Sequence, residues 1–105
     1  MLNPRFSEPP PSEKRAKKGK NMKRIAVIGI VLENPALHQD QFNSIVSEFG
    51  DIISGRMGLP FKEQNMGVIS LVVTAEMDKI NSLTGKLGKI PGISVKAAVS
   101  KKEVS

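Results

Sequence analysis

The sequence contains no cysteine, tryptophan or tyrosine, and only one histidine and four phenylalanines in 105 residues. Without cysteine there is no disulfide framework, no thiolate metal site and no cysteine nucleophile, and the redox compartment is not readable. The longest apolar run, residues 25–32, is about ten residues too short to span a membrane, and the charged N-terminal region lacks the apolar segment of a signal peptide. We therefore expect a cytoplasmic protein with no membrane partner.

Basic residues are concentrated at the start of the chain. The formal net charge is +6, and residues 1–21 hold six basic residues against two acidic ones. The same segment contains Pro9-Pro10-Pro11 and only four hydrophobic residues. Such a composition buries too little apolar surface to offset the entropy lost on ordering. We predict a disordered basic, proline-rich tail over residues 1–21 and one domain over residues 22–105.

Two interpretations of this tail remain open. It could be a basic arm that neutralises phosphates and adds a salt-dependent affinity for nucleic acid. Alternatively, it could be a translated leader before Met22, because Lys18-Gly19 can be encoded by a purine-rich stretch just upstream of the Met22 codon. We favour the leader, so nucleic acid is an expected partner only through residues 1–21. N-terminal sequencing of the native protein distinguishes the two.

Hydrophobic periodicity predicts six elements in the order βαββαβ. Strands are expected at residues 25–32, 51–58, 68–75 and 93–100, because these segments are apolar and rich in β-branched residues or alternate in polarity. In the second strand, Ile53 and Met57 are expected on one face with Ser54 and Arg56 on the other. Residues 59–66 are predicted to be a polar connection.

The two helices are predicted from apolar spacing and from their end signals. Asn34 followed by Pro35 fits an N-cap and first helical position, and Gly50 fits the end of that helix. Residues 76–87 carry a second apolar helical face and end at Gly88. This order is the ferredoxin-like α+β sandwich, a four-stranded antiparallel sheet with two helices on one face and strands one and three in the centre.

The two central strands are apolar on both of their faces. In the first strand, Val27 and Val31 oppose Ile28 and Ile30, and the third strand shows the same pattern. A sheet covered on one side should instead alternate apolar and polar residues. One face would therefore be an exposed apolar patch, which we predict to be buried in a homo-oligomer, a dimer or a tetramer. The alternative is that the patch is covered within one chain, for instance by the tail.

Several segments resemble one family of small ACT-like proteins, the iron-only hydrogenase system regulators, which are related to the effector domain of the nickel-responsive repressor. The resemblance is carried by residues 22–27, 55–60, 65, 67–73, 83–88 and 91–96. It implies a non-catalytic, oligomeric regulatory module that binds a small effector at a loop or subunit interface. The alternative is an accessory subunit that docks a protein partner through the open sheet face, without a small ligand.

The resemblance does not extend to every feature of the nickel sensor. That sensor binds metal through several histidines and one cysteine, whereas this chain has only His38 and no cysteine. We therefore expect no metal site and no cofactor; His38 is the single weak candidate, and a half-buried histidine is its simpler interpretation. No DNA-binding segment is recognisable, so any regulation of transcription is expected to act through a regulatory protein partner.

Five residues are candidates for contacting an effector: Glu33, Asn34, Arg56, Gly58 and Asn65. Glu33 and Asn34 precede a helix N-terminus, which favours an anion, although plain capping by Asn34 is the simpler explanation. Arg56 has the planar fork that suits a carboxylate or phosphate, or it is an edge-strand charge that opposes aggregation. Gly58, like Gly67, could instead serve a positive φ or a bulge, and Asn65 a turn.

An enzyme would need a nucleophile with its base, paired acids or a metal, and the sequence shows none of these constellations. Thr84-Gly85-Lys86 superficially resembles a phosphate-binding loop, but the required glycine and hydroxyl residues are missing around it. We interpret this segment as helix surface. The sequence therefore predicts a binding or interaction protein and does not name its ligand.

Overall fold

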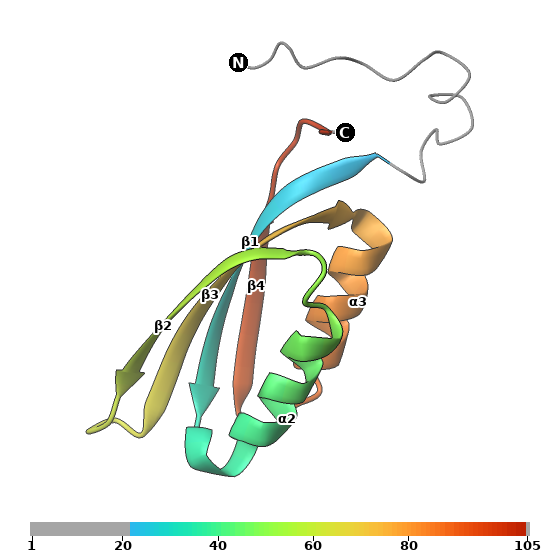
Figure 1. Cartoon of the computed structure of the whole chain (residues 1–105). Coiled ribbons are helices and arrows are strands. Elements are labelled where there is room, and N and C mark those ends of the chain that lie inside the picture. The colour runs from blue at the N-terminus through green and yellow to red at the C-terminus, as the bar shows by residue number, and fades with distance from the viewer. Residues whose placement is uncertain (1–21, 105) are drawn as a thin grey trace, which may run out of the picture.

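The structure is a computed structural model that describes residues 22–104. Its elements are β1 (Lys23–Glu33), α2 (Pro35–Glu48), β2 (Ile53–Phe61), β3 (Met66–Glu76), α3 (Met77–Leu87) and β4 (Ile93–Val99). The strands form one antiparallel sheet in the order β2-β3-β1-β4, and both helices cover the same face (Figure 1). The predicted ferredoxin-like sandwich with central first and third strands is confirmed. The predicted tail lies outside the described residues.

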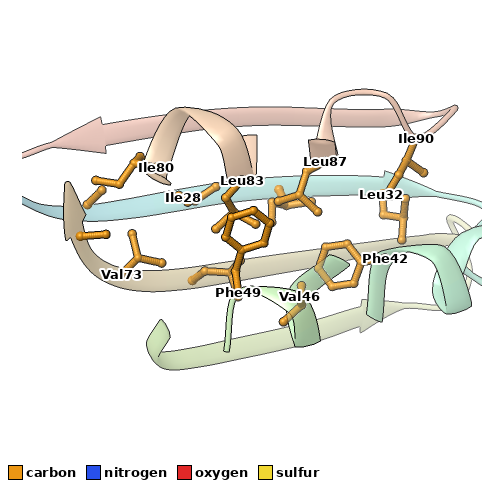
Figure 2. Packing of buried hydrophobic residues seen from close by; sticks show 14 residues of the cluster. Ile28, Leu32, Phe42, Val46, Phe49, Val73, Ile80, Leu83, Leu87 and Ile90 are labelled. Carbon is orange, nitrogen blue, oxygen red and sulfur yellow. The ribbon is translucent and has the colours of Figure 1, made fainter. Parts of the chain in front are cut away.

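The core lies between the helices and the inner face of the sheet. Along β1 every second residue from Ala26 to Leu32 is buried, and α3 contributes the fully buried Ile80, Leu83 and Leu87. Figure 2 shows Leu83 and Leu87 beside the aromatic rings of Phe42, from α2, and Phe49, the residue that follows α2. Each fully buried aliphatic side chain stabilises the fold by about 1.5–3 kcal/mol. The apolar helix faces predicted from the sequence therefore supply the core.

Strand β2 is longer than its sequence predicts. It begins at Ile53 and continues to Phe61, so the prediction of a strand over residues 51–58 followed by a polar connection over residues 59–66 is wrong. Pro60 is accommodated because β2 is an edge strand, where a missing N–H can face away from the ladder. The connection to β3 is only the short turn of residues 62–65, in which the Asn65 N–H donates to the Lys62 carbonyl at 3.1 Å.

A bulge reverses the faces of β2. The register with β3 shifts between Ile53, which pairs with Val73, and Gly55, which pairs with Val72. Ile53 therefore faces the core while Met57 faces the opposite side, and the prediction that these two residues share a face is wrong. One extra residue in a strand inverts every later side chain, because the side-chain period is two. Arg56 is brought to the helix-covered face, beside the buried Leu71.

The opposite face of the sheet, here called the open sheet face, is exposed and apolar. Its exposed large hydrophobic residues are Ile25, Val27, Val31, Met57, Leu59, Phe61, Val68 and Val72. Their exposed fractions range from 36% at Val72 to 65% at Met57. The prediction that β1 and β3 are apolar on both faces is confirmed, and no described residue covers this face.

Candidate functional site

Three turns meet at the C-terminal end of β1. The Asn34 N–H donates to the Asn65 carbonyl at 3.0 Å, and the Asn65 side-chain amide donates to the side-chain oxygen of Asn34. The Glu33 N–H donates to the carbonyl of Gly92, in the turn before β4, at 2.8 Å. Gly92 has φ +76°, a conformation that glycine adopts without strain. These contacts hold the β1–α2, β2–β3 and α3–β4 connections together.

The simpler explanation of Asn34, side-chain capping of the first helix, is wrong. Asn34 does occupy the N-cap position before Pro35, but its backbone is left-handed and its side chain makes no capping hydrogen bond. The side chain is instead used by Asn65, which is also left-handed at φ 55°. Asparagine tolerates this backbone region better than most residues. The prediction that Asn65 forms a turn before the third strand is confirmed.

The first of two adjacent hollows, the Asn34 hollow, is small and polar. It is lined by Glu33, Asn34, Gln64, Asn65 and Met66 and has a volume of about 270 Å³. The Asn34 and Asn65 side chains are hydrogen-bonded to each other. Among the described residues that line this hollow, only Glu33 is charged, and it is acidic. A carboxylate at its wall opposes an anion there, so the charge of this hollow does not favour the anion expected at the helix N-terminus.

The second hollow, the Arg56 pocket, lies between α2 and the β2–β3 hairpin. Its volume is about 260 Å³, and its lining residues are Leu32, Pro35, Gln39, Phe42, Asn43, Arg56, Gly58, Leu59, Pro60, Met66, Gly67, Val68 and Ile69. The tip of this hairpin and the start of α2 lie at the same end of the sheet (Figure 1). Arg56 is the only charged side chain among the described residues that line it, and most of the others are apolar.

Arg56 is positioned by an aromatic ring. Its guanidinium lies 5.9 Å from the centroid of the Phe42 ring, an arrangement in which the ring attracts the cation. Within residues 22–104 the ion pairs join Arg24 to Glu103, Lys79 to Asp51 and Lys86 to Glu48. Arg56 belongs to none of these pairs, so its guanidinium is available to an anionic group that enters the pocket.

Two glycines keep the pocket open. Gly58 and Gly67 both lie on the helix-covered face, since they pair with Ile69 and Leu32 respectively. A Cβ at either position would meet its nearest neighbour only at 3.8 Å, an ordinary contact distance. Gly92 is the single glycine with a positive φ among the described residues, and the bulge lies elsewhere. The predicted backbone explanation of Gly58 and Gly67 is therefore wrong.

The structure divides the five predicted site residues between the two hollows. Glu33, Asn34 and Asn65 line the first hollow, Arg56 and Gly58 line the second, and Met66 lines both. Phe42 also lines the second hollow and is not among the predicted site residues, because an apolar residue on a helix face indicates only a core position. The same residue is both buried in the core and placed under Arg56.

The remaining candidates have ordinary positions. His38 is half-buried on α2, and within residues 22–104 no three His, Cys, Asp or Glu side chains come together to hold a metal. Thr84, Gly85 and Lys86 lie within α3, where the Thr84 hydroxyl donates to the Asn81 carbonyl at 3.1 Å, so the helix-surface interpretation is confirmed. No helix of the described part combines the length and apolar character that crossing a membrane requires.

One family model matches a segment that includes the lining residues of both hollows. Residues 24–97 match the family model described as "TM1266-like: Iron-only hydrogenase system regulator, putative". The chain belongs to this family. The matched segment runs from the start of β1 into β4, so the resemblance found in the sequence is confirmed over almost the whole described domain.

Solved structures place this TM1266-like protein among ACT-like folds. An uncharacterized protein, TM1266, from Thermotoga maritima is 38% identical, with a TM-score of 0.72 over 75% of this chain and 99% of that chain. The ACT domain of GTP pyrophosphokinase from Chlorobium tepidum is 23% identical in its crystal structure, with a TM-score of 0.62 over 72% and 99% of the two chains. The solution structure of the same domain is 22% identical, with a TM-score of 0.58 over 76% of this chain and 89% of that chain. No curated sequence matches this chain.

Proposed function

We propose that this protein is a non-catalytic, cytoplasmic regulatory module of an iron-only hydrogenase system that works as a homo-oligomer and binds a small effector. Membership of the regulator family supports the regulatory role. The open sheet face is the observation that carries the proposal. Eight exposed large hydrophobic residues on one side of a small domain are typical of an interface.

The relief of the open sheet face suits a second copy of the same surface. Val27 pairs with Val72 and Val31 with Val68, which gives two apolar ridges across the central strands. Between them Gly29 pairs with Ser70, and these two small residues leave a dip in the middle of a row whose ends are Lys96 and Met57. A two-fold axis near this row would set a ridge of each copy against the hollow of the other. This arrangement supports the proposed packing of two copies through the open sheet face.

Gly29 is not required by the fold of a single chain. A Cβ at this position would approach only the Lys96 carbonyl oxygen, at 3.8 Å, and the residue has no positive φ. Glycine inside a strand weakens the strand and often marks the close approach of another backbone. A neighbouring sheet packed on this row gives a reason for its presence that the single chain does not.

Sedimentation velocity on the full chain tests the assembly. We expect a dimer or tetramer at micromolar concentration, with dissociation on dilution. A species of 11.4 kDa at every concentration would contradict the homo-oligomer.

The same exposed face favours a second candidate function. A hydrogenase-related protein partner could cover the apolar residues in place of another copy, and the chain would then be an accessory subunit without a small ligand. Co-purification from the native host separates the candidates. A monomer in isolation that forms a stoichiometric complex with one such protein would support the accessory role.

A further inference from the structure

We propose that the Arg56 pocket binds a small organic carboxylate whose body is compact and apolar. This inference deepens the effector-binding part of the proposed function by naming the site and the class of ligand. It is tested separately from the oligomeric state, because Arg56, Gly58 and Gly67 lie on the helix-covered face and not on the open sheet face. Three observations support it: unoccupied space that the fold does not need, one cation that pairs with no described residue, and described walls that are otherwise uncharged.

The unoccupied space lies where β2 and β3 each carry a glycine, which has no side chain. Gly58 and Gly67 lie on the helix-covered face, where neighbouring rows carry Leu71, Leu32 and Ile69. Neither glycine is forced by its backbone conformation, and a methyl group at either would meet no atom closer than 3.8 Å. Gly58 is exposed and Gly67 is half-buried, so the hollow is open to solvent and a ligand can enter it. An apolar group of a ligand would fill this hollow.

The cation is placed to meet a carboxylate. Arg56 projects from an edge strand onto the Phe42 ring, and it forms no ion pair with a described residue. Its planar guanidinium can donate two parallel hydrogen bonds to the two oxygens of a carboxylate. The Phe42 ring limits the directions that the guanidinium can take, which lowers the entropy lost when it binds.

The walls select against strongly hydrated ions. Besides Arg56, the polar side chains among the described lining residues are only Gln39 and Asn43 of α2. Phosphate or sulfate would lose hydration against apolar walls and carry a second charge with no partner, so such ions are disfavoured. The volume of about 260 Å³ is below the roughly 300–1,000 Å³ of drug-sized pockets, which suits a small ligand.

Titration of the full-length protein with phenylacetate, followed by amide NMR, tests this assignment. We expect saturable shifts of the amides of Arg56, Gly58 and Gly67, and no saturable shifts with phenylacetamide, the uncharged isostere, or with sulfate. Equal shifts with phenylacetamide would overturn the role of the charge. No shifts at these amides with phenylacetate, or stronger shifts with sulfate, would overturn the proposed ligand class.

Matched variants locate the binding. Arg56→Gln should weaken phenylacetate binding by about tenfold or more, since it removes the charge-assisted hydrogen bonds. Gly58→Val should block binding by filling the hollow, whereas Gly55→Val, in the same strand with nothing within 4 Å of its Cβ, should bind as the native protein does. Amide dispersion reports whether each variant is folded. Unchanged affinity in both Arg56→Gln and Gly58→Val would overturn the proposal.

The same samples keep this inference apart from the proposed assembly. A monomer that binds phenylacetate at these amides would contradict the homo-oligomer and support the pocket. An oligomer whose pocket amides do not shift with phenylacetate would support the homo-oligomer and contradict the pocket. If the pocket amides shift with protein concentration alone, and phenylacetate adds nothing, the groove receives a neighbouring copy and the carboxylate assignment is overturned.

Discussion

Asn34 and Asn65, 31 residues apart in the chain, bind each other through both backbone and side chain. The Asn34 N–H donates to the Asn65 carbonyl, and the Asn65 amide donates back to the Asn34 side-chain oxygen. Both residues have a left-handed backbone, at φ 51° and 55°. Two strained turns are therefore fixed against each other at the end of the sheet that carries both hollows.

Replacement of Asn65 tests this pairing. Asn65→Ala should lower the free energy of unfolding by about 1–3 kcal/mol, because it removes a hydrogen bond and places alanine in a left-handed conformation. Asn65→Gly relieves the backbone strain without restoring the side-chain bond, so its loss should be smaller. Urea unfolding measures both variants. Equal stability of the native protein and Asn65→Ala would contradict a structural role for the pair.

Two leucines with opposite exposure test the core. Leu83 is 0% exposed on α3, and Leu83→Ala should cost about 2–5 kcal/mol of unfolding free energy because it leaves a cavity. Leu37 is 76% exposed on α2, and Leu37→Ala should change that free energy by no more than about 0.5 kcal/mol. Chemical denaturation of the two variants under identical conditions checks the difference. A similar cost for both would contradict the described packing.

Gly29→Val tests the open sheet face as a self-docking surface. Valine would fill the dip between the two ridges, and its Cβ would meet only the Lys96 carbonyl oxygen, at 3.8 Å, so the monomer should remain folded. The dissociation constant of the assembly should rise tenfold or more, and a tenfold rise corresponds to about 1.4 kcal/mol of binding free energy. Sedimentation measures the constant and circular dichroism the fold. Gly85→Ala, at an exposed site on α3, is the control. Undiminished assembly of Gly29→Val would exclude this row from the interface.

The salt bridge between Lys86 and Glu48 should contribute little. The Lys86 Nζ and the Glu48 Oε2 lie 2.6 Å apart, but the Lys86 side chain is 44% exposed and the Glu48 side chain is 53% exposed. Exposed pairs are worth up to about 1 kcal/mol, so Glu48→Gln should lower stability by less than that, and the loss should shrink further in high salt. Unfolding at low and high ionic strength gives the comparison. A larger, salt-independent loss would show that Glu48 stabilises the helix in another way.

The sequence by itself determined the order of the elements and the two-sided apolar character of β1 and β3. Both follow from local periodicity: a strand's side chains alternate with period two and a helix's recur with period 3.6, whatever the rest of the chain does. The family resemblance was also readable, because short segments such as residues 55–60 and 91–96 carry it without any knowledge of their neighbours.

Only the tertiary structure decided where the candidate site residues point and what they meet. The bulge before Gly55 moves Arg56 to the helix side, and a one-residue shift in pairing leaves no mark on composition. The Asn34–Asn65 pair and the contact between Arg56 and Phe42 join residues far apart in the chain. Such contacts depend on how the layers pack. The candidate residues could therefore be predicted from the sequence, whereas their division between two hollows follows only from the packing.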